Sequence, residues 1–96
     1  MSSASEIAYV SGHTEAVTTI IEQLRNGADN DTITACLDKV YPGWSEPLNI
    51  PNDDSEWRRT GFKSAVEVSF TILNNMTREG ALEALEESLN DEDEDE

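Results

Sequence analysis

The acidic C-terminal stretch constrains the folding of this chain more than any other feature of its sequence. No lysine or arginine follows Arg78, and ten of the 21 acidic residues lie in 79–96. Two thirds of the formal net charge of −15 therefore falls in this stretch. Like charges at such a density repel one another, oppose compaction and attract basic partners with a strength that depends on salt. We expect this stretch to offer an acidic surface, and we expect neither bare nucleic acid nor an anionic membrane as a partner.

The length of 96 residues suits one domain and is too short for two. We expect residues 1–90 to form a single small globular domain. Residues 91–96 carry six like charges and no apolar side chain, which predicts a disordered acidic tail. The single cysteine, Cys36, fits a reducing compartment. The N-terminus lacks the pattern of a signal peptide, and no apolar run approaches the length of a membrane span, so we expect a cytoplasmic protein.

Apolar residues at helical spacing predict a helix from about residue 14 to residue 25. Its apolar face is formed by Val17, Ile20, Ile21 and Leu24. The pair Asn26-Gly27 supplies a left-handed stop at its C-terminal end. A short apolar patch at 7–10 precedes this helix, and Ser11-Gly12 is expected to break the chain between the two.

A second helix is predicted after a short turn, with Asp29 or Asp31 as its N-cap and Pro42-Gly43 at its end. Its apolar face holds Ile33, Cys36, Leu37 and Val40. The short connection favours an antiparallel hairpin of the two helices. Residues 42–55 contain all three prolines and predict a long surface loop. The apolar side chains that could pin this loop to the core are Trp44, Leu48 and Ile50.

The stretch 65–73 fits two periods. Alternation of Val66, Val68, Phe70 and Ile72 with polar residues is typical of a strand. A helical face is also present, formed by Phe62, Ala65, Val66, Ser69, Leu73 and Met76. A strand here would need a partner, for which only 6–10 is a candidate, so we favour a helix. The predicted fold is an all-α bundle of three to four helices with a long Pro-containing loop. The alternative is an α+β fold with a two-stranded sheet from 6–10 and 65–73.

The last predicted helix is capped by Asn75 or Thr77 and has Glu79 in its first turn. Its narrow apolar stripe consists of Leu82, Leu85 and Leu89, with Ala81 and Ala84 beside it. Carboxylates occupy the remaining faces. We expect the leucine stripe to pack on the segment 62–76, which leaves the opposite face of the helix free for recognition.

Few residue types suited to catalysis are present, and we predict a protein that is not an enzyme. His13 and Cys36 are the only imidazole and the only thiol, and Cys36 falls on an apolar helix face. The segment 29–32 opens like a calcium loop but lacks the glycine and the terminal glutamate that such a loop needs. Helix capping explains these residues, so we predict neither a metal site nor a cofactor.

The cluster Trp57, Arg58 and Arg59 is the only place where basic and aromatic residues adjoin. It could touch a phosphate or an acidic partner. The favoured interpretation is internal: the two arginines pair with carboxylates of the same chain, and Trp57 anchors the long loop.

The sequence therefore predicts an acidic interaction protein that binds a basic surface of a partner protein, one that itself binds nucleic acid. Carboxylates on a helix can present charge at spacings comparable with those of DNA phosphates, so a DNA- or RNA-mimic inhibitor is the sharper form of this hypothesis. The residues predicted to bind the partner are Glu79, Glu83, Glu86, Glu87, Asp91, Glu92, Asp93, Glu94 and Trp44.

In composition the chain resembles small acidic proteins by which phages antagonise host defence or host DNA metabolism, although it contains no motif of a particular family. The alternative function is a helical adaptor or assembly factor whose charge is mainly solubilising. In that case the loop from Trp44 to Ile50, or the stripe of Leu82, Leu85 and Leu89, would make an apolar contact with the partner.

Overall fold

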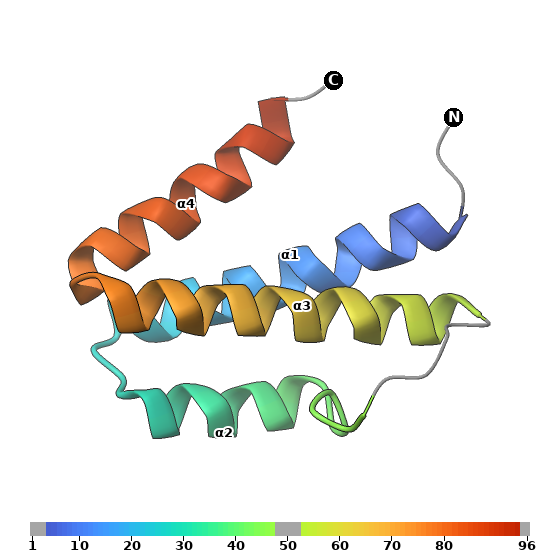
Figure 1. The fold of residues 1–96 in the computed structure, drawn as a ribbon, viewed down its shortest axis with the longest axis horizontal. Coiled ribbons are helices and arrows are strands. Elements are labelled where there is room, and N and C mark those ends of the chain that lie inside the picture. The colour runs from blue at the N-terminus through green and yellow to red at the C-terminus, as the bar shows by residue number, and fades with distance from the viewer. Residues whose placement is uncertain (1–3, 48–52, 95–96) are drawn as a thin grey trace.

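The computed structural model describes residues 4–47 and 53–94, which form four α-helices (Figure 1). These are α1 (Ala4–Arg25), α2 (Asn30–Val40), α3 (Asp54–Asn75) and α4 (Arg78–Glu94). The predicted all-α bundle is confirmed. The alternative sheet is wrong, because its two segments lie inside α1 and α3 and the described residues contain no strand.

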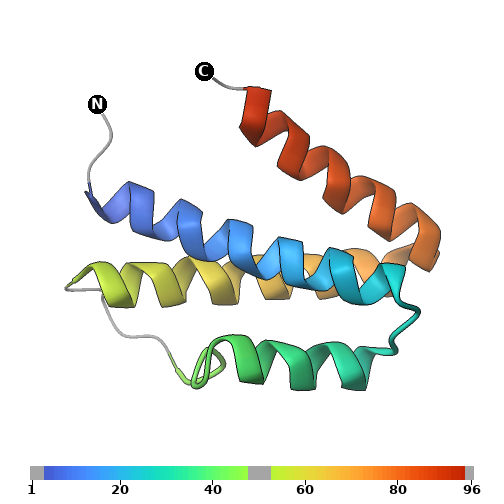
Figure 2. The ribbon, with the colours of Figure 1, turned by 180° about the vertical axis from the view of Figure 1, so that it is seen from behind.

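The bundle is built around α1 and α3, which lie side by side and run in the same direction (Figures 1 and 2). The helices α2 and α4 run in the opposite direction and lie on opposite sides of this pair. α2 contacts α1 along the predicted hairpin, and α4 contacts both α1 and α3. The longest helices thus form a central layer that is covered by one shorter helix on each side.

Two glycines allow α1 and α3 to approach closely. A Cβ atom added to Gly12 would lie 2.9 Å from the carbonyl carbon of Arg58 and closer still to its oxygen. The contact is reciprocal, because a Cβ atom on Gly61 would meet the carbonyl group of Tyr9 at the same distance. Small residues continue this seam one turn further on, where Ala16 of α1 and Ala65 of α3 are buried.

The break that Ser11-Gly12 was expected to make is therefore absent, and α1 runs through it from Ala4 to Arg25. A glycine inside a helix costs roughly 0.5–1 kcal/mol relative to alanine. Here the lost stability is offset by the packing of two backbones that a side chain at Gly12 would keep apart. The glycine serves a tertiary contact rather than a turn.

The predicted stop after α1 is confirmed in detail. Gly27 has a φ of 80°, and its amide donates to the carbonyl of Leu24 at 3.0 Å. The amide of Ala28 donates to the carbonyl of Gln23 at 3.0 Å. These two bonds form a Schellman motif, which closes the end of α1 and turns the chain into α2.

Side-chain caps start the other three helices. The carboxylate of Asp29 accepts from the amide of Thr32 at 2.8 Å at the start of α2, as predicted. The cap of α3 is Asp53, whose carboxylate accepts from the amide of Glu56 at 2.9 Å. Thr77 accepts from the amide of Gly80 at 3.0 Å at the start of α4.

The core is a single cluster, and it contains the predicted apolar faces of the helices. The predicted apolar face of α3 is buried from Phe62 to Leu73. Met76, which follows the end of the helix, is exposed. On α2, Ile33 and Leu37 are fully buried and Val40 is exposed. Tyr41 and Trp44 join α2 to α3, with ring centroids 5.1 and 6.1 Å from that of Phe62.

The helix α4 packs through Ala81 and Leu85, which are buried, with Leu82 and Leu89 partly buried beside them. Its backbone continues to Glu94, past the boundary at residue 90 that we predicted between the domain and an acidic tail. Once a packed helix exists, each further residue adds one hydrogen bond, whereas a like-charge pair costs only a few tenths of a kcal/mol.

Candidate partner-binding surface

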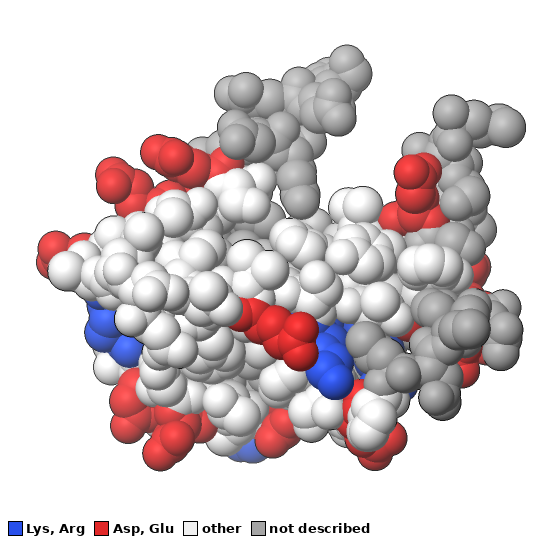
Figure 3. Space-filling view, in the orientation of Figure 1, with Lys and Arg blue, Asp and Glu red and all other residues white. Residues whose placement is uncertain are grey.

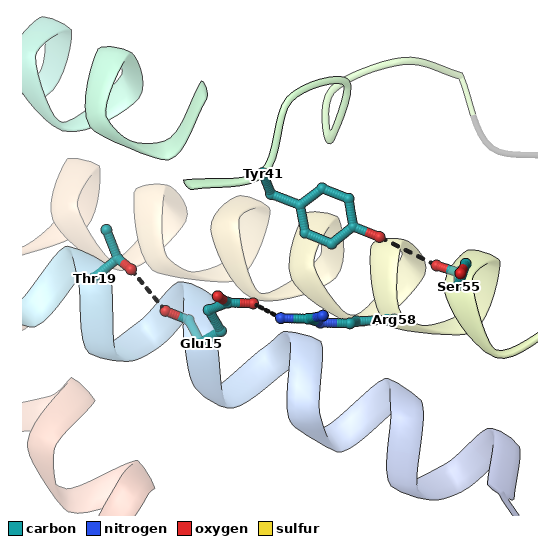
Figure 4. A network of polar contacts seen from close by, with 5 residues as sticks. All are labelled: Glu15, Thr19, Tyr41, Ser55 and Arg58. Atoms are coloured by element: carbon teal, nitrogen blue, oxygen red, sulfur yellow. Dashed lines mark hydrogen bonds and ion pairs between the residues drawn. The ribbon is translucent and has the colours of Figure 1, made fainter. Parts of the chain in front are cut away.

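One ion pair joins α4 to the central layer, and another joins the two helices of that layer. Arg25 at the end of α1 pairs with Glu86 of α4, and its Nε donates to the carboxylate at 3.1 Å. Arg58 of α3 pairs with Glu15 of α1, and its guanidinium lies 5.7 Å from the ring centroid of Tyr41 (Figure 4). The tyrosine hydroxyl donates to the carbonyl of Ser55 at 3.1 Å. The predicted internal role of Arg58 is thus present.

Arg59 holds the turn that follows α2. Its guanidinium donates to the carbonyls of Glu46 at 2.8 Å, Pro47 at 3.3 Å and Gly43 at 3.4 Å. Lys63, one turn further along α3, donates to the Glu46 carbonyl at 3.4 Å. Arg59 therefore anchors residues 43–47 to α3, a role that we predicted for Trp57. The ring of Trp57 instead meets that of Tyr9 edge to face, with centroids 6.5 Å apart.

In the calcium-like segment 29–32, Asp29 caps α2 and Asn30 accepts a hydrogen bond from Arg78. Arg78 donates to the carbonyl of Ala28 and to Oδ1 of Asn30, the latter at 3.3 Å. The hydrogen bonds from Thr32 to Asp29, helped by the charge of Arg78, lower the pKa of the Asp29 carboxyl. Among the described residues, no group of three or more His, Cys, Asp or Glu side chains could hold a metal ion.

These contacts commit five of the six basic residues to partners within the chain. The acidic residues of α4 are left in large excess. Glu79, Glu83 and Glu87 follow one another at four-residue intervals, and all three are exposed. Because four residues make slightly more than one turn, they form a single ridge on the side of α4 that faces away from the core. We call these three residues the α4 ridge.

The ridge borders a shallow hollow of about 410 Å³ that Glu79, Glu83 and Glu86 line together with Leu82. Acidic side chains gather along the edge that α4 forms at the upper left of Figure 3. Glu86 differs from the ridge, because its carboxylate is already paired with Arg25. The structure therefore brings together four of the predicted partner-binding residues and leaves three of them unpaired by any basic side chain described here.

The remaining predicted site residues fall into two groups. Asp91, Glu92, Asp93 and Glu94 belong to the last turn of α4, and their side chains lie outside the described part of the structure. Trp44 is only 8% exposed, and its indole Nε1 donates to Asp38 at 2.8 Å. A partner could reach Trp44 only if residues 41–47 opened, so we leave it out of the binding surface.

The only imidazole and the only thiol lie on different helices. His13 of α1 stacks on Tyr9 with ring centroids 6.5 Å apart, and Cys36 of α2 is partly buried. No helix in the described ranges combines the length and the apolar character that crossing a membrane requires. Comparison of the chain with protein-family models, with curated proteins and with solved structures finds no match.

Sequence reasoning missed an exposed apolar patch at the start of α1. Ile7 is 62% exposed and Val10 is 49% exposed. The sequence marks both as apolar, but it does not reveal that α1 extends back to Ala4 or that neither side chain is covered. The signal available was the spacing: Val10, Val17 and Ile21 recur at helical intervals if the helix continues through Gly12.

Proposed function

We propose that this protein is a non-enzymatic acidic interaction protein that binds a basic surface of a partner through the α4 ridge. The observation that carries the proposal is the division of charge within the fold. Five basic side chains stabilise internal contacts, whereas the exposed carboxylates Glu79, Glu83 and Glu87 of α4 face solvent. A surface of one sign attracts and orients a complementary partner.

The sharper form of the proposal is mimicry of nucleic acid. The 17 residues of α4 include eight acidic ones, which at about 1.5 Å per residue gives roughly one charge per 3 Å of helix axis. One strand of B-DNA presents a phosphate about every 3.4 Å. A groove that binds a phosphate backbone would therefore meet a similar linear charge density on α4. We infer a nucleic-acid-binding protein as the partner and inhibition as the consequence, in the manner of a phage-style antagonist.

The adaptor alternative is weakened by the burial of several of the apolar residues that it was expected to use, whereas Leu48 and Ile50 of the predicted loop lie outside the described residues. Trp44 and Leu85 are buried, and Leu82 and Leu89 pack against the core. Other apolar residues that an adaptor could use are Ile7 and Val10, which are exposed on α1.

A capture experiment with charge-matched variants tests the proposal. The test variant replaces Glu79, Glu83 and Glu87 by glutamine. The control makes the same change in charge on other helices, at the exposed residues Glu22, Asp31 and Glu67. We expect the immobilised wild-type chain and the control to retain a basic nucleic-acid-binding protein from lysate, and the test variant to lose it.

Salt gives an independent readout of the same contact. Raising the ionic strength from about 0.05 M to about 0.5 M shortens the Debye length from over 10 Å to about 4 Å, so an interaction through exposed carboxylates should weaken steeply. Retention that survives both the salt and the ridge substitutions would contradict the proposal and favour the adaptor.

A further inference from the structure

The apolar patch on α1 lies on the side of that helix where α4 packs further along. Ile7 precedes Arg25 by 18 residues, which is five full turns, so both lie on the same line of α1. Arg25 is bonded to Glu86 of α4. Val10 precedes the buried Ile21 by 11 residues, or about three turns. Near the C-terminal end of α1, α4 covers one side of that helix. Ile7 and Val10 therefore lie on the same side, near the N-terminal end of α1.

The helix α4 diverges from α1 before it reaches this patch (Figures 1 and 2). The packing stripe of α4 explains the divergence. It runs through Ala81 and Leu85 to Leu89, the last apolar residue of the helix. Position 92, which repeats the register of Leu85 after about two turns, is a glutamate. Burying a carboxylate against an apolar surface without a partner is strongly unfavourable, and the sequence of α4 after Leu89 has no apolar residue that would favour packing on the patch.

The patch lines two hollows, and each has an acidic residue on its rim. One hollow, of about 530 Å³, is lined by Ile7 and Val10 together with Glu6 and Ser11. The other, of about 400 Å³, is lined by Ile7, Ala8 and Ser11 of α1 and by Asp54, Ser55 and Arg58 of α3. The charge of Arg58 is paired with Glu15. In Figure 3 uncharged atoms form the floor of the space between the start of α1 and α4. The surface thus combines an apolar floor with acidic borders.

We propose that this patch binds an amphipathic basic helix of the partner. That helix would pack beside the N-terminal part of α1, from which α4 diverges. The proposal rests on the function proposed above and adds the form of the partner segment. An apolar floor between two helices suits one face of a third helix. The carboxylates of Glu6 and Asp54 on the rims, together with the net charge of −15, favour lysine and arginine on the flanks of that helix.

The charge of the chain disfavours other occupants. A second copy would bring another net charge of −15 to the same place, and an anionic lipid surface would be repelled for the same reason. A neutral apolar segment would gain nothing from the acidic borders. A helix with one apolar face and basic flanks would contact both the apolar floor and the acidic borders.

The test uses a fluorescent 18-residue peptide of leucine and lysine with its leucines on one helical face. A scrambled peptide of the same composition has the same charge but no apolar face. Fluorescence anisotropy with the full chain should show the amphipathic peptide binding about tenfold more tightly than the scrambled one, because a tenfold ratio needs only part of the gain from burying two aliphatic side chains.

Substitution then locates the contact. The double variant Ile7→Ser and Val10→Ser should reduce binding of the amphipathic peptide to the level of the scrambled one. Val40→Ser is the matched control, because Val40 is 40% exposed on α2, on the far side of the central layer. It should leave binding unchanged. All three side chains are exposed, and circular dichroism should confirm that the helix content is retained.

The outcomes separate this inference from the function on which it rests. If both peptides bind equally and depend on the α4 ridge, the helix-binding patch is refuted and the acidic interaction protein stands. If neither peptide binds at low salt, both proposals fail. If the chain self-associates and the double variant abolishes that association, the patch is an interface between copies and the proposal of a basic helix is overturned.

Discussion

The substitution Gly12→Ala reverses the usual effect of this change in a helix. In an open helix interior, replacing glycine by alanine stabilises the fold by roughly 0.5–1 kcal/mol. At Gly12 the new methyl group would overlap the carbonyl group of Arg58, which belongs to the backbone of α3 and cannot rotate away. The helices α1 and α3 would have to separate along their whole contact. We therefore predict a loss of stability.

The size of the loss follows from the contact geometry. Real Cβ atoms essentially never lie within 3.0 Å of such atoms, and the added Cβ would be 2.9 Å from the Arg58 carbonyl carbon and nearer to its oxygen. Overpacking of this kind costs about 1–3 kcal/mol, and separation of the helices also loosens Ala16 and Ala65. We expect a net loss of about 2–3 kcal/mol, which lowers the Tm by roughly 10–20 °C in a domain of this size.

Gly80→Ala supplies a matched control in α4. There an added Cβ would meet only side-chain atoms, Oγ1 of Thr77 at 3.2 Å and Sδ of Met76 at 3.5 Å. Oγ1 of Thr77 also accepts the capping bond from the Gly80 amide at 3.0 Å, and a shift of a few tenths of an ångström leaves that bond intact. This variant should be neutral or more stable than wild type. Urea unfolding followed by far-UV circular dichroism measures both variants on one scale. Gly61→Ala should behave like Gly12→Ala, and the double variant should lose less than the sum, because both changes force the same two helices apart.

A rise of the urea midpoint in Gly12→Ala as large as that in Gly80→Ala would contradict this prediction. That result would show that α1 and α3 have room for a methyl group and that Gly12 is tolerated rather than required. It would also remove the reason given for the continuity of α1 through residues 11 and 12.

Three further variants test other parts of the fold. Ser69→Ala should stabilise the chain by about 1 kcal/mol in urea unfolding, because the buried Ser69 hydroxyl has no hydrogen-bond partner among the described atoms; a loss of stability would mean that this hydroxyl is bonded. The folded-state pKa of Asp29 is lowered, so its carboxylate contributes stability above the pKa of the unfolded chain and loses it as the pH falls through the folded value. The advantage of wild type over Asp29→Asn should therefore shrink between pH 6 and roughly pH 2, and a difference that stays constant would contradict this. Arg59→Ala should free the 43–47 carbonyls, shift the fluorescence of Trp44 to the red and cost about 1–2 kcal/mol; unchanged fluorescence would show that Arg59 does not hold this turn.

Periodicity predicted the helices because each has one apolar face that becomes the core. The face of Val17, Ile20, Ile21 and Leu24 is buried as a unit, and the helical reading of 65–73 is correct. The strand-like alternation there arises because the exposed face of α3 also contains apolar residues, among them Val68. Two apolar faces on one helix imitate the period of a strand.

The start of α1 was missed because a local rule interprets Ser11-Gly12 as a turn, although the helical spacing of Val10, Val17 and Ile21 continues through it. The glycine is required by a helix that lies more than 40 residues away in the sequence. A stripe of small residues at four-residue spacing, with Gly12 and Ala16 in α1 and Gly61 and Ala65 in α3, is the pattern that could have indicated a close crossing.

The acidic surface was predictable from composition, but the roles of individual residues were not. Glu86 and Glu87 are neighbours in the sequence, yet only Glu86 pairs with Arg25. Trp44 was named both as a residue that could pin the loop to the core and as a partner-binding residue, and its burial and its bond to Asp38 agree only with the first. Such pairings depend on which helices meet, and so does the exposure of Ile7 and Val10.

Competition between duplex DNA and this protein for a captured partner gives the most direct test of mimicry by α4. The captured protein would be bound to the immobilised chain and challenged with a short DNA duplex at constant salt. We predict that the duplex releases the partner in proportion to its concentration, because both ligands use one basic groove, and that the control substitutions at Glu22, Asp31 and Glu67 leave the concentration needed unchanged. A stable complex that contains DNA, the partner and this protein together would contradict the mimicry.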